Sequence, residues 1–203
     1  LANQIKSPAD FKGRRLGVTG LGSSTSFLTQ YLGALHQVKA SEITLVATGG
    51  GSTFIAAMKQ GRIDAGMTTE PTASRLLSTG EAQVLVDLRT PDATRKALGG
   101  LYPFACLYME TARVNNHRAE TQKLVNAFVK ALRYISTHSA AEITAQMPAN
   151  YLAGDKVLYI QSLANSKSMF TPDGVMPPSG PPTVLKILSS VNKTVRETTI
   201  ELS

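Results

Sequence analysis

The stretch that decides the fold is Arg15–Ser26, RLGVTGLGSSTS, in which a short apolar run passes directly into a loop of small residues. Arg15–Thr19 predicts a β-strand, and the apolar spacing of Phe27–Gln37 predicts a helix directly after the loop. A strand, a glycine-containing loop and a helix in succession are typical of a βαβ unit. The first segment of the chain therefore indicates an α/β protein with a parallel sheet.

The same order of elements repeats along the first half of the chain. Further strands are predicted at Ile43–Ala47, Ile63–Thr68, Val84–Leu88 and, after a polar connection over residues 90–100, Tyr102–Met109. Helices are predicted at Phe54–Gln60 and Glu70–Ser78, each ended by a glycine. We expect a doubly wound, mostly parallel sheet.

The second half changes to amphipathic helices. They are predicted at Ala119–His138, Ala140–Met147, Lys156–Asn165 and Pro182–Val195. We therefore divide the chain into an α/β unit over residues 8–110, which ends in the returning strand, and a helical segment over residues 111–203. The helical segment contains too few predicted strands for a sheet of its own. We expect it either to pack on the α/β unit or to complete a sheet whose other strands lie outside these residues.

Composition excludes several classes of protein. With 42% hydrophobic and 17% charged residues, the 203-residue chain can form a core. The net charge of +7 comes from scattered Lys and Arg without interleaved aromatic residues, which argues against nucleic-acid binding. No apolar run reaches the roughly 18 residues of a membrane span. Cys106, the single cysteine, lies in an apolar run and is predicted to be a small core residue.

The loop between the first strand and the first helix is the best candidate for a binding site. Its residues Gly22, Ser23, Ser24 and Thr25 place hydroxyls beside backbone N–H groups that a helix N-terminus leaves unpaired. Such a junction suits a carboxylate, sulfonate or phosphate. The plain alternative is that Ser23 or Ser24 caps the helix and nothing binds. No lysine follows as in a P-loop.

Two further loops follow the second and third strands. Thr48–Thr53, TGGGST, is again a loop of glycines and hydroxyl residues between a strand and a helix, so it can also offer backbone N–H groups to an anion. Its candidate contacts are Gly50, Gly51, Ser52 and Thr53. We rank it below the first loop, because the first and third strands usually flank the ligand crevice. Thr69 and Glu70 end the third strand. The Glu70 carboxylate either meets an amine or hydroxyl of the ligand, ties the hinge, or simply favours a helix N-terminus.

Evidence for catalysis is scarce. The three histidines lie far apart in the sequence, and no cluster has metal-ligand spacing. No serine lies in a G-x-S-x-G elbow. The sequence therefore predicts no catalytic residue, no metal ion and no cofactor.

Three motifs of the sequence resemble those of a known protein family. They are DFKGRRLGV at Asp10–Val18, GSST at Gly22–Thr25 and MKQGRIDAGMTTEP at Met58–Pro71. Over Ile5 to about Arg89 the chain resembles solute-binding proteins of ABC transporters, of the nitrate, sulfonate and taurine type, which are related to NMT1/THI5-like proteins.

The resemblance implies the type II periplasmic-binding-protein fold, in which two α/β lobes are joined by hinge strands and the ligand lies between them without any chemistry. The C-terminal helices are then expected to pack across both lobes. The first motif marks the start of the second lobe, so we expect much of the first lobe, and half of the cleft, to lie outside these residues. The resemblance also implies a small organic anion as ligand and a membrane permease as partner. The expected localisation is periplasmic or extracytoplasmic, with a lipid anchor if the protein comes from a single-membrane bacterium. The alternatives on the same fold are a thiamine-pyrimidine-precursor binding protein, a synthase-like enzyme and an effector-sensing domain of a transcription regulator. The cysteine-rich motif expected of the synthase is absent, which argues against that enzyme.

Overall fold

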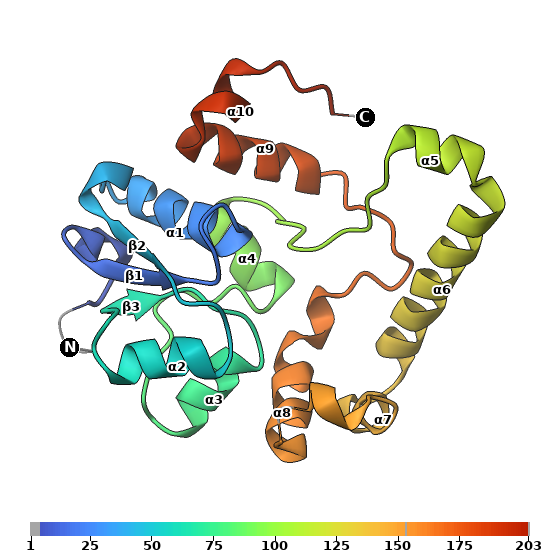
Figure 1. Cartoon of the computed structure of the whole chain (residues 1–203), viewed down its shortest axis with the longest axis horizontal. Coiled ribbons are helices and arrows are strands. Elements are labelled where there is room, and N and C mark those ends of the chain that lie inside the picture. Colours follow the sequence, from blue (N-terminus) through green and yellow to red (C-terminus); the bar gives the residue numbers. More distant parts are fainter. Residues whose placement is uncertain (1–4, 153, 203) are drawn as a thin grey trace.

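The computed structural model describes residues 5–152 and 154–202, and it opens with the predicted α/β unit. Within these residues, three parallel strands form one sheet in the order β2–β1–β3. The strands are β1 at Arg15–Val18, β2 at Thr44–Ala47 and β3 at Ala65–Gly66. Because β1 is central, the loops that follow β2 and β3 lie on either side of the loop that follows β1 (Figure 1).

The central strand is buried on both faces, as its apolar run predicts for a parallel sheet. Leu16 and Val18 are both 0% exposed. Gly17 faces the other side, where a Cβ atom would lie 2.5 Å from Cδ1 of Ile63 and 3.3 Å from Cε2 of Phe54. Glycine at this position therefore lets the second layer of the core pack directly against the strand.

Helices cover both faces of the sheet (Figure 1). Those of the α/β unit are α1 at Ser24–Leu35, α2 at Ser52–Lys59, α3 at Thr72–Ser78 and α4 at Pro91–Leu98, with short 3-10 turns at Pro8–Phe11 and Ala40–Glu42. One core cluster includes Leu16 together with Leu28 and Leu32 of α1. The other includes Phe54 and Ala57 of α2 with Leu76 of α3. The predicted α/β class is confirmed.

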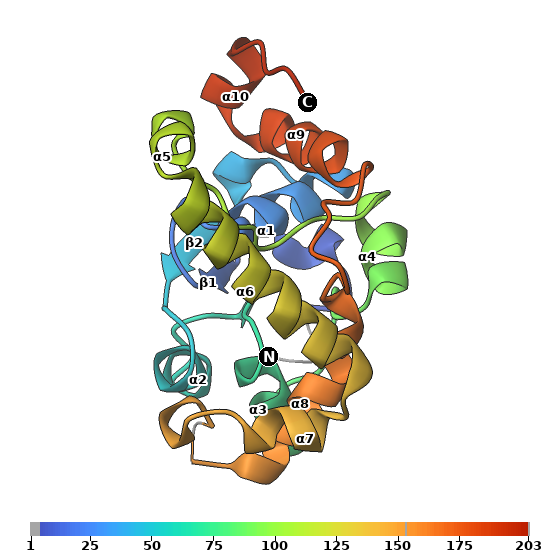
Figure 2. The ribbon, with the colours of Figure 1, turned by 90° about the vertical axis from the view of Figure 1, so that its right-hand side faces the viewer.

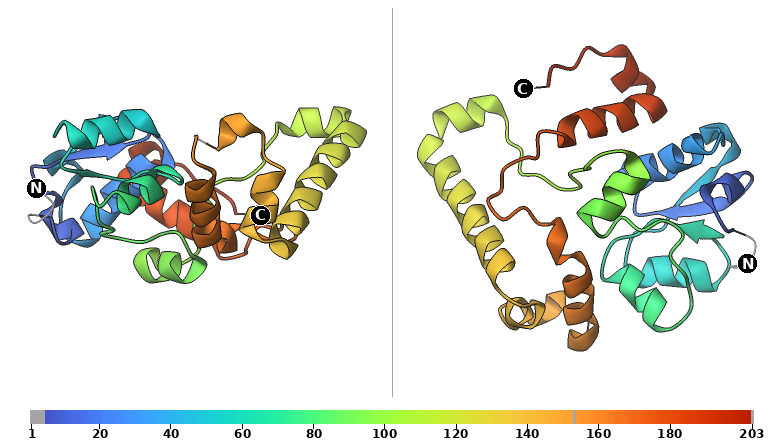
Figure 3. Two further views of the ribbon diagram at one scale, coloured as in Figure 1. Left: turned by 90° about the horizontal axis from the view of Figure 1, so that it is seen from below. Right: turned by 180° about the vertical axis from the view of Figure 1, so that it is seen from behind.

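The second half is helical, as predicted. Its helices are α5 at Thr111–Asn116, α6 at Arg118–Thr137, α7 at Ala140–Ala145, α8 at Lys156–Ser166, α9 at Gly180–Val191 and α10 at Lys193–Glu197, with 3-10 turns at Ala149–Tyr151 and Lys167–Met169. α9 packs on α1 and places Ile187 in the core, while α8 packs on α3. α5 and α6 lie at the end of the molecule away from the sheet (Figures 2 and 3). Among the described helices, none combines the length and apolarity of a membrane span.

The strand predicted at Val84–Leu88 is wrong. The segment is irregular, although Leu85, Val86 and Leu88 still pack against the core. The Asp87 carboxylate accepts a hydrogen bond from the backbone N–H of Arg89 at 2.9 Å. Such a local side-chain contact offers the backbone an alternative to a strand ladder, so burial here does not require pairing with the sheet.

The returning strand predicted at Tyr102–Met109 is also wrong. Its residues run without a strand partner in the described chain, and Pro103 has no N–H to give to a ladder. Tyr102 is buried at 5% exposure, but Tyr108 is 89% exposed. Cys106 is exposed rather than in the core, because the apolar run around it is not covered by another element.

The connection predicted over residues 90–100 contains a helix instead, α4. Thr90 caps it by accepting a hydrogen bond from the N–H of Ala93 at 3.2 Å, and Pro91 occupies the first turn. Gly99 ends it in the left-handed region at φ 79°. These are ordinary start and stop signals of a helix, on a segment too polar to show a strong apolar period.

Arg15 and Asp64 clamp the start of β1 to the segment before β3. The Arg15 guanidinium donates to both Asp64 oxygens, at 3.3 and 2.8 Å, and the Arg15 N–H donates to Asp64 Oδ2 at 2.8 Å. These hydrogen bonds from Arg15 hold the pKa of the Asp64 carboxyl below its ordinary value. Asp64 therefore has a structural role rather than a hydrolytic one.

This clamp predicts a pH-dependent loss of stability. A lowered folded-state pKa contributes stability above the unfolded Asp pKa of about 3.9, which is lost as the pH falls through the folded-state value. We expect Asp64→Asn to be less stable than the wild type at pH 7, and the difference to close below about pH 3.9. Urea unfolding at several pH values measures this. Asp92→Asn is the control, because the Asp92 carboxylate, which forms an ion pair with Arg95, is 95% exposed. This variant should have almost the same stability as the wild type at every pH.

Candidate functional site

The candidate site lies where the three strands end, and the structure brings its loops together there. The backbone N–H of Thr48 donates to the carbonyl of Val18 at 2.9 Å, which joins the loop after β2 to the end of β1. The N–H of Gly51 donates to the Thr72 hydroxyl at 2.9 Å, which joins the same loop to the first residue of α3. The three predicted segments therefore meet at the carboxyl edge of the sheet.

In the first loop, two of the predicted hydroxyls are engaged with the protein. Ser23 is the N-cap of α1, and its Oγ accepts from the N–H of Ser26 at 3.4 Å and donates to the Gly20 carbonyl at 2.7 Å. Oγ1 of Thr25, which is buried, lies 2.7 Å from Ser23 Oγ and 2.8 Å from Thr19 Oγ1. Ser23 and Thr25 thus hold the loop in place, and Ser23 caps the helix, as one of the two interpretations of the sequence expects.

The first turn of α1 keeps donors for a ligand. Of the four N–H groups that a helix start leaves without intrahelical acceptors, Ser23 donates to the Gly20 carbonyl at 3.2 Å and Ser26 to the Ser23 side chain at 3.4 Å. In the described chain, the N–H groups of Ser24 and Thr25 are therefore the two available at this 12-residue helix. Gly22, exposed at φ 82°, leaves the approach to them open, since a Cβ atom there would meet nothing within 4 Å.

Ser24 and Tyr102 lie close together beside this turn. Burial of the ring raises the pKa of Tyr102 above its ordinary value, and the nearby Ser24 hydroxyl offsets part of that rise. The Tyr102 ring packs on Phe104 with centroids 5.2 Å apart, and Phe104 is 40% exposed. This pair places an aromatic surface beside Ser24, although it does not belong to a strand.

The second loop is more open than the first. Gly50, Gly51, Ser52 and Thr53 are all exposed. Gly51 is the N-cap of α2 at φ 61°, a backbone conformation that favours glycine. The Thr53 hydroxyl donates to the Gly50 carbonyl at 2.9 Å, which leaves Ser52 as the hydroxyl of this loop that faces solvent.

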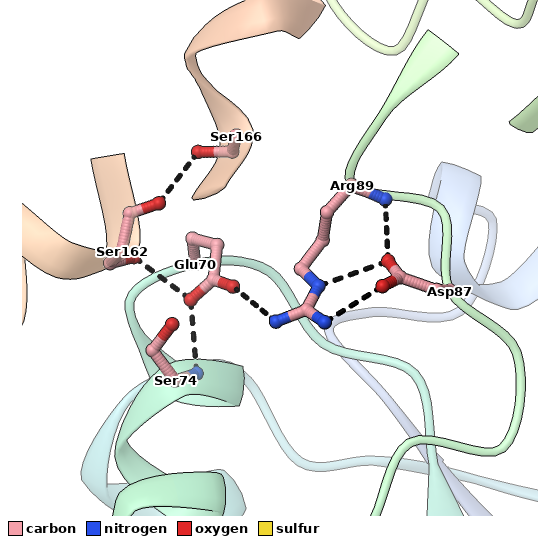
Figure 4. Close-up of polar contacts among 6 residues, drawn as sticks. All are labelled: Glu70, Ser74, Asp87, Arg89, Ser162 and Ser166. Carbon is pink, nitrogen blue, oxygen red and sulfur yellow. Dashed lines mark hydrogen bonds and ion pairs between the residues drawn. The ribbon is translucent and has the colours of Figure 1, made fainter. Parts of the chain in front are cut away.

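In the third segment, Thr69 is exposed and Glu70 is held by the protein. Glu70 Oε2 accepts from the N–H of Ser74 at 3.0 Å and from the Ser162 hydroxyl of α8 at 2.9 Å. Glu70 Oε1 lies 3.6 Å from Nη1 of Arg89 (Figure 4). Oε2 is therefore occupied at the start of α3 and ties α8 to the α/β unit, while the hinge and ligand roles that the sequence left open stay predictions.

Arg89 and Asp87 belong to this site but the sequence did not single them out. The Arg89 guanidinium donates to both Asp87 oxygens, through Nε at 2.9 Å and Nη2 at 2.7 Å. These bonds lower the pKa of the Asp87 carboxyl. The only local signal is the D-x-R spacing in a segment that resembles a strand, where alternate residues would share one face.

The side chains that could ligate a metal ion or act in catalysis are not gathered at this site. Among the described residues, no group of three His, Cys, Asp or Glu side chains is placed to hold a metal ion. His138 stacks on Tyr134 at the end of α6, with ring centroids 3.7 Å apart, and His117 lies near the exposed Glu120. Neither histidine lies in the candidate site.

Comparison with known proteins places this geometry in a family. The family model described as NMT1/THI5 like matches residues 2–142. A protein of known structure from Bordetella bronchiseptica RB50 is 37% identical, with a TM-score of 0.87. The alkanesulfonate-binding protein SsuA from Xanthomonas axonopodis pv. citri, solved bound to MOPS, is 17% identical, with a TM-score of 0.67, and shares the fold.

Both matches cover 96% of this chain and 62% of the other, so the chain spans less than two thirds of either solved protein. No curated protein matches the chain. Since the family model matches well over half of the chain, the chain belongs to the NMT1/THI5-like family.

Proposed function

We propose that the chain is part of an extracytoplasmic solute-binding protein of an ABC importer, which captures a small organic anion and does no chemistry on it. The observation that carries the proposal is the first turn of α1, which leaves the N–H groups of Ser24 and Thr25 available at the carboxyl edge of the sheet. A helix start of this kind favours negative charge through its N–H groups and its dipole.

The proposed contacts come from all three loops. Ser24 and the N–H groups of the α1 start, with Gly22 and the fixed hydroxyls of Ser23 and Thr25 around them, form the main anion contact. Gly50–Thr53 and Thr69 form the exposed rim, and Glu70 borders them. The bound MOPS of SsuA, a sulfonate, supports an anion of this class as ligand. A membrane permease is the proposed partner, consistent with family membership.

Titration calorimetry of the chain with a panel of anions tests the proposal. The panel contains alkanesulfonates, nitrate and an aromatic carboxylate, with a neutral sugar and a simple cation as controls. We expect at least one anion to bind and neither control to bind. Recovery of the bound anion unchanged, by mass spectrometry after long incubation, checks that no reaction takes place. Binding of the sugar or the cation in place of every anion would contradict the proposal.

Ser24→Ala is expected to weaken binding of the best anion by about 1 kcal/mol, the net worth of one hydrogen bond. The measurement is the dissociation constant by calorimetry. Tyr102→Phe separates two causes, because it removes the phenol beside the Ser24 hydroxyl and leaves that hydroxyl in place. If Tyr102→Phe weakens binding as much as Ser24→Ala does, the serine acts through the tyrosine. Ser41→Ala, at an exposed serine outside the site, should have no effect.

A further inference from the structure

Helices α5 to α8 lie outside the buried cores of the molecule. We call residues 105–179, which contain these helices, the arm; it lies beside the α/β unit (Figures 1 and 2). Neither of the two buried clusters of the described chain contains a residue of the arm. In contrast, α9 places Ile187 in the cluster of β1. The core therefore fixes α9, and other contacts have to hold the arm.

Contacts inside the arm join its helices into one body. The Lys167 ammonium group donates to the His138 carbonyl, which ties the end of α8 to the end of α6. α7 packs on both α6 and α8. A Cβ atom at Gly174 would lie 3.3 Å from Cδ1 of Leu132, so the segment after α8 also lies against α6. A displacement of α8 would therefore carry α6 with it.

One attachment of the arm is at its two ends, which leave the α/β unit and α9 side by side. A Cβ atom at Gly180, the first residue of α9, would lie 2.5 Å from Cγ of Pro103. A second attachment is the packing of α8 on α3. Leu158 and Ser162, four residues apart and so on one face of α8, are 7% and 3% exposed. Because both ends leave at one point, the contact with α3 is needed to set the position of the arm.

A charged hydrogen bond crosses the contact between α8 and α3. The Ser162 hydroxyl donates to Glu70 Oε2 at 2.9 Å (Figure 4). Groups of the α/β unit hold the carboxylate on the other side, since the Ser74 N–H donates to Oε2 at 3.0 Å and Nη1 of Arg89 lies 3.6 Å from Oε1. We propose that Glu70 and Ser162 form a latch, which holds the arm against α3 when no ligand is bound.

Burial makes this bond decisive for the position of the arm. The Glu70 side chain is 16% exposed and Ser162 is 3% exposed, so water cannot easily replace the hydroxyl while α8 lies on α3. Without the hydroxyl, Oε2 loses a donor that it can regain from water only when α8 moves away. Loss of the latch therefore favours a displaced arm. Since Glu70 borders the candidate site, the latch also sets where the arm lies relative to that site.

Double electron–electron resonance measures the position of the arm. Spin labels are attached at Lys123→Cys on α6 and Gln60→Cys at the end of α2, both exposed positions, with Cys106→Ser to remove the exposed native thiol. No ligand is added, so the result does not depend on anion capture. We expect one main distance in this protein. Ser162→Ala should add a second population, because the ratio of displaced to latched arm rises about tenfold, the scale of a hydrogen bond to a charged group.

Ser166→Ala on the same helix is the matched control, because its hydroxyl donates to the Ser162 carbonyl within α8. Glu70→Gln weakens the latch from the other side and keeps the test valid if Ser162→Ala does not fold. The double variant Glu70→Gln/Ser162→Ala should displace the arm less than the sum of the single effects, because both act on one bond. Unchanged distances in both latch variants, or an equal second population in Ser166→Ala, would overturn the proposal and leave anion capture untouched.

Discussion

Phe54→Ala is expected to lower the free energy of unfolding by about 3–5 kcal/mol, the usual cost of truncating a large aromatic side chain in a core. Phe54 is 1% exposed at the centre of the cluster beneath α2 and α3. Its ring lies against the two glycines of the sheet, since a Cβ atom at Gly66 would be 2.7 Å from its Cζ and one at Gly17 3.3 Å from its Cε2.

The expected value lies in the upper part of that range for a structural reason. A cavity closes partly when neighbouring side chains move into it, but Gly17 and Gly66 have no side chains to move. Urea unfolding followed by circular dichroism gives the value. Val157→Ala, at a side chain that is 77% exposed, is the control and should change stability by no more than about 0.5 kcal/mol. A loss below about 1 kcal/mol for Phe54→Ala would contradict this packing.

The strands of the sheet were predictable because each carries its own signal. β1, β2 and β3 all lie within predicted strands, and the order β2–β1–β3 leaves the second strand at an edge, as the ranking of the loops assumed. Apolar runs bounded by glycine loops decide these elements locally. The hydroxyl loops were found for the same reason, since a helix start following a strand is a local feature of the sequence.

The predicted strands at Val84–Leu88 and Tyr102–Met109 failed because a strand needs a partner. Their residues have the composition of strands, but the described chain gives neither segment a neighbour in the sheet. In the first, the Asp87 carboxylate accepts a hydrogen bond from the backbone N–H of Arg89, and this bond replaces the ladder. Composition reported burial correctly in the first segment and wrongly in most of the second, and in neither did it report whether a second strand is present.

The environment of Glu70 could be predicted only in part. Its position before α3 follows from local signals, since acids favour a helix N-terminus. Its partner Ser162 is 92 positions away, and nothing in the sequence links the two. Arg89 likewise reaches Glu70 from a segment predicted as a strand. The network that holds the edge of the candidate site is therefore a product of tertiary packing.

Ile187→Ala is expected to cost about 2–5 kcal/mol, although the residue lies in the helical segment and far from the sheet in sequence. Ile187 is 0% exposed and belongs to the same cluster as Leu16 of β1 and Leu28 of α1. Its helix, α9, packs on α1. Leu124→Ala in α6 is the matched control, because that side chain is 37% exposed and should cost less than about 1 kcal/mol.

The same variant addresses the predicted division between residues 8–110 and 111–203. If α9 shares one cooperative core with the sheet, Ile187→Ala lowers the protection of the Leu16 amide against hydrogen exchange by the full loss of stability. If the helical segment unfolds independently, protection in β1 stays at the wild-type level while that of α9 falls. We expect the first result, because Ile187 and Leu16 belong to one buried cluster. A loosened α9 would then also disturb α1, whose first turn carries the proposed anion contact.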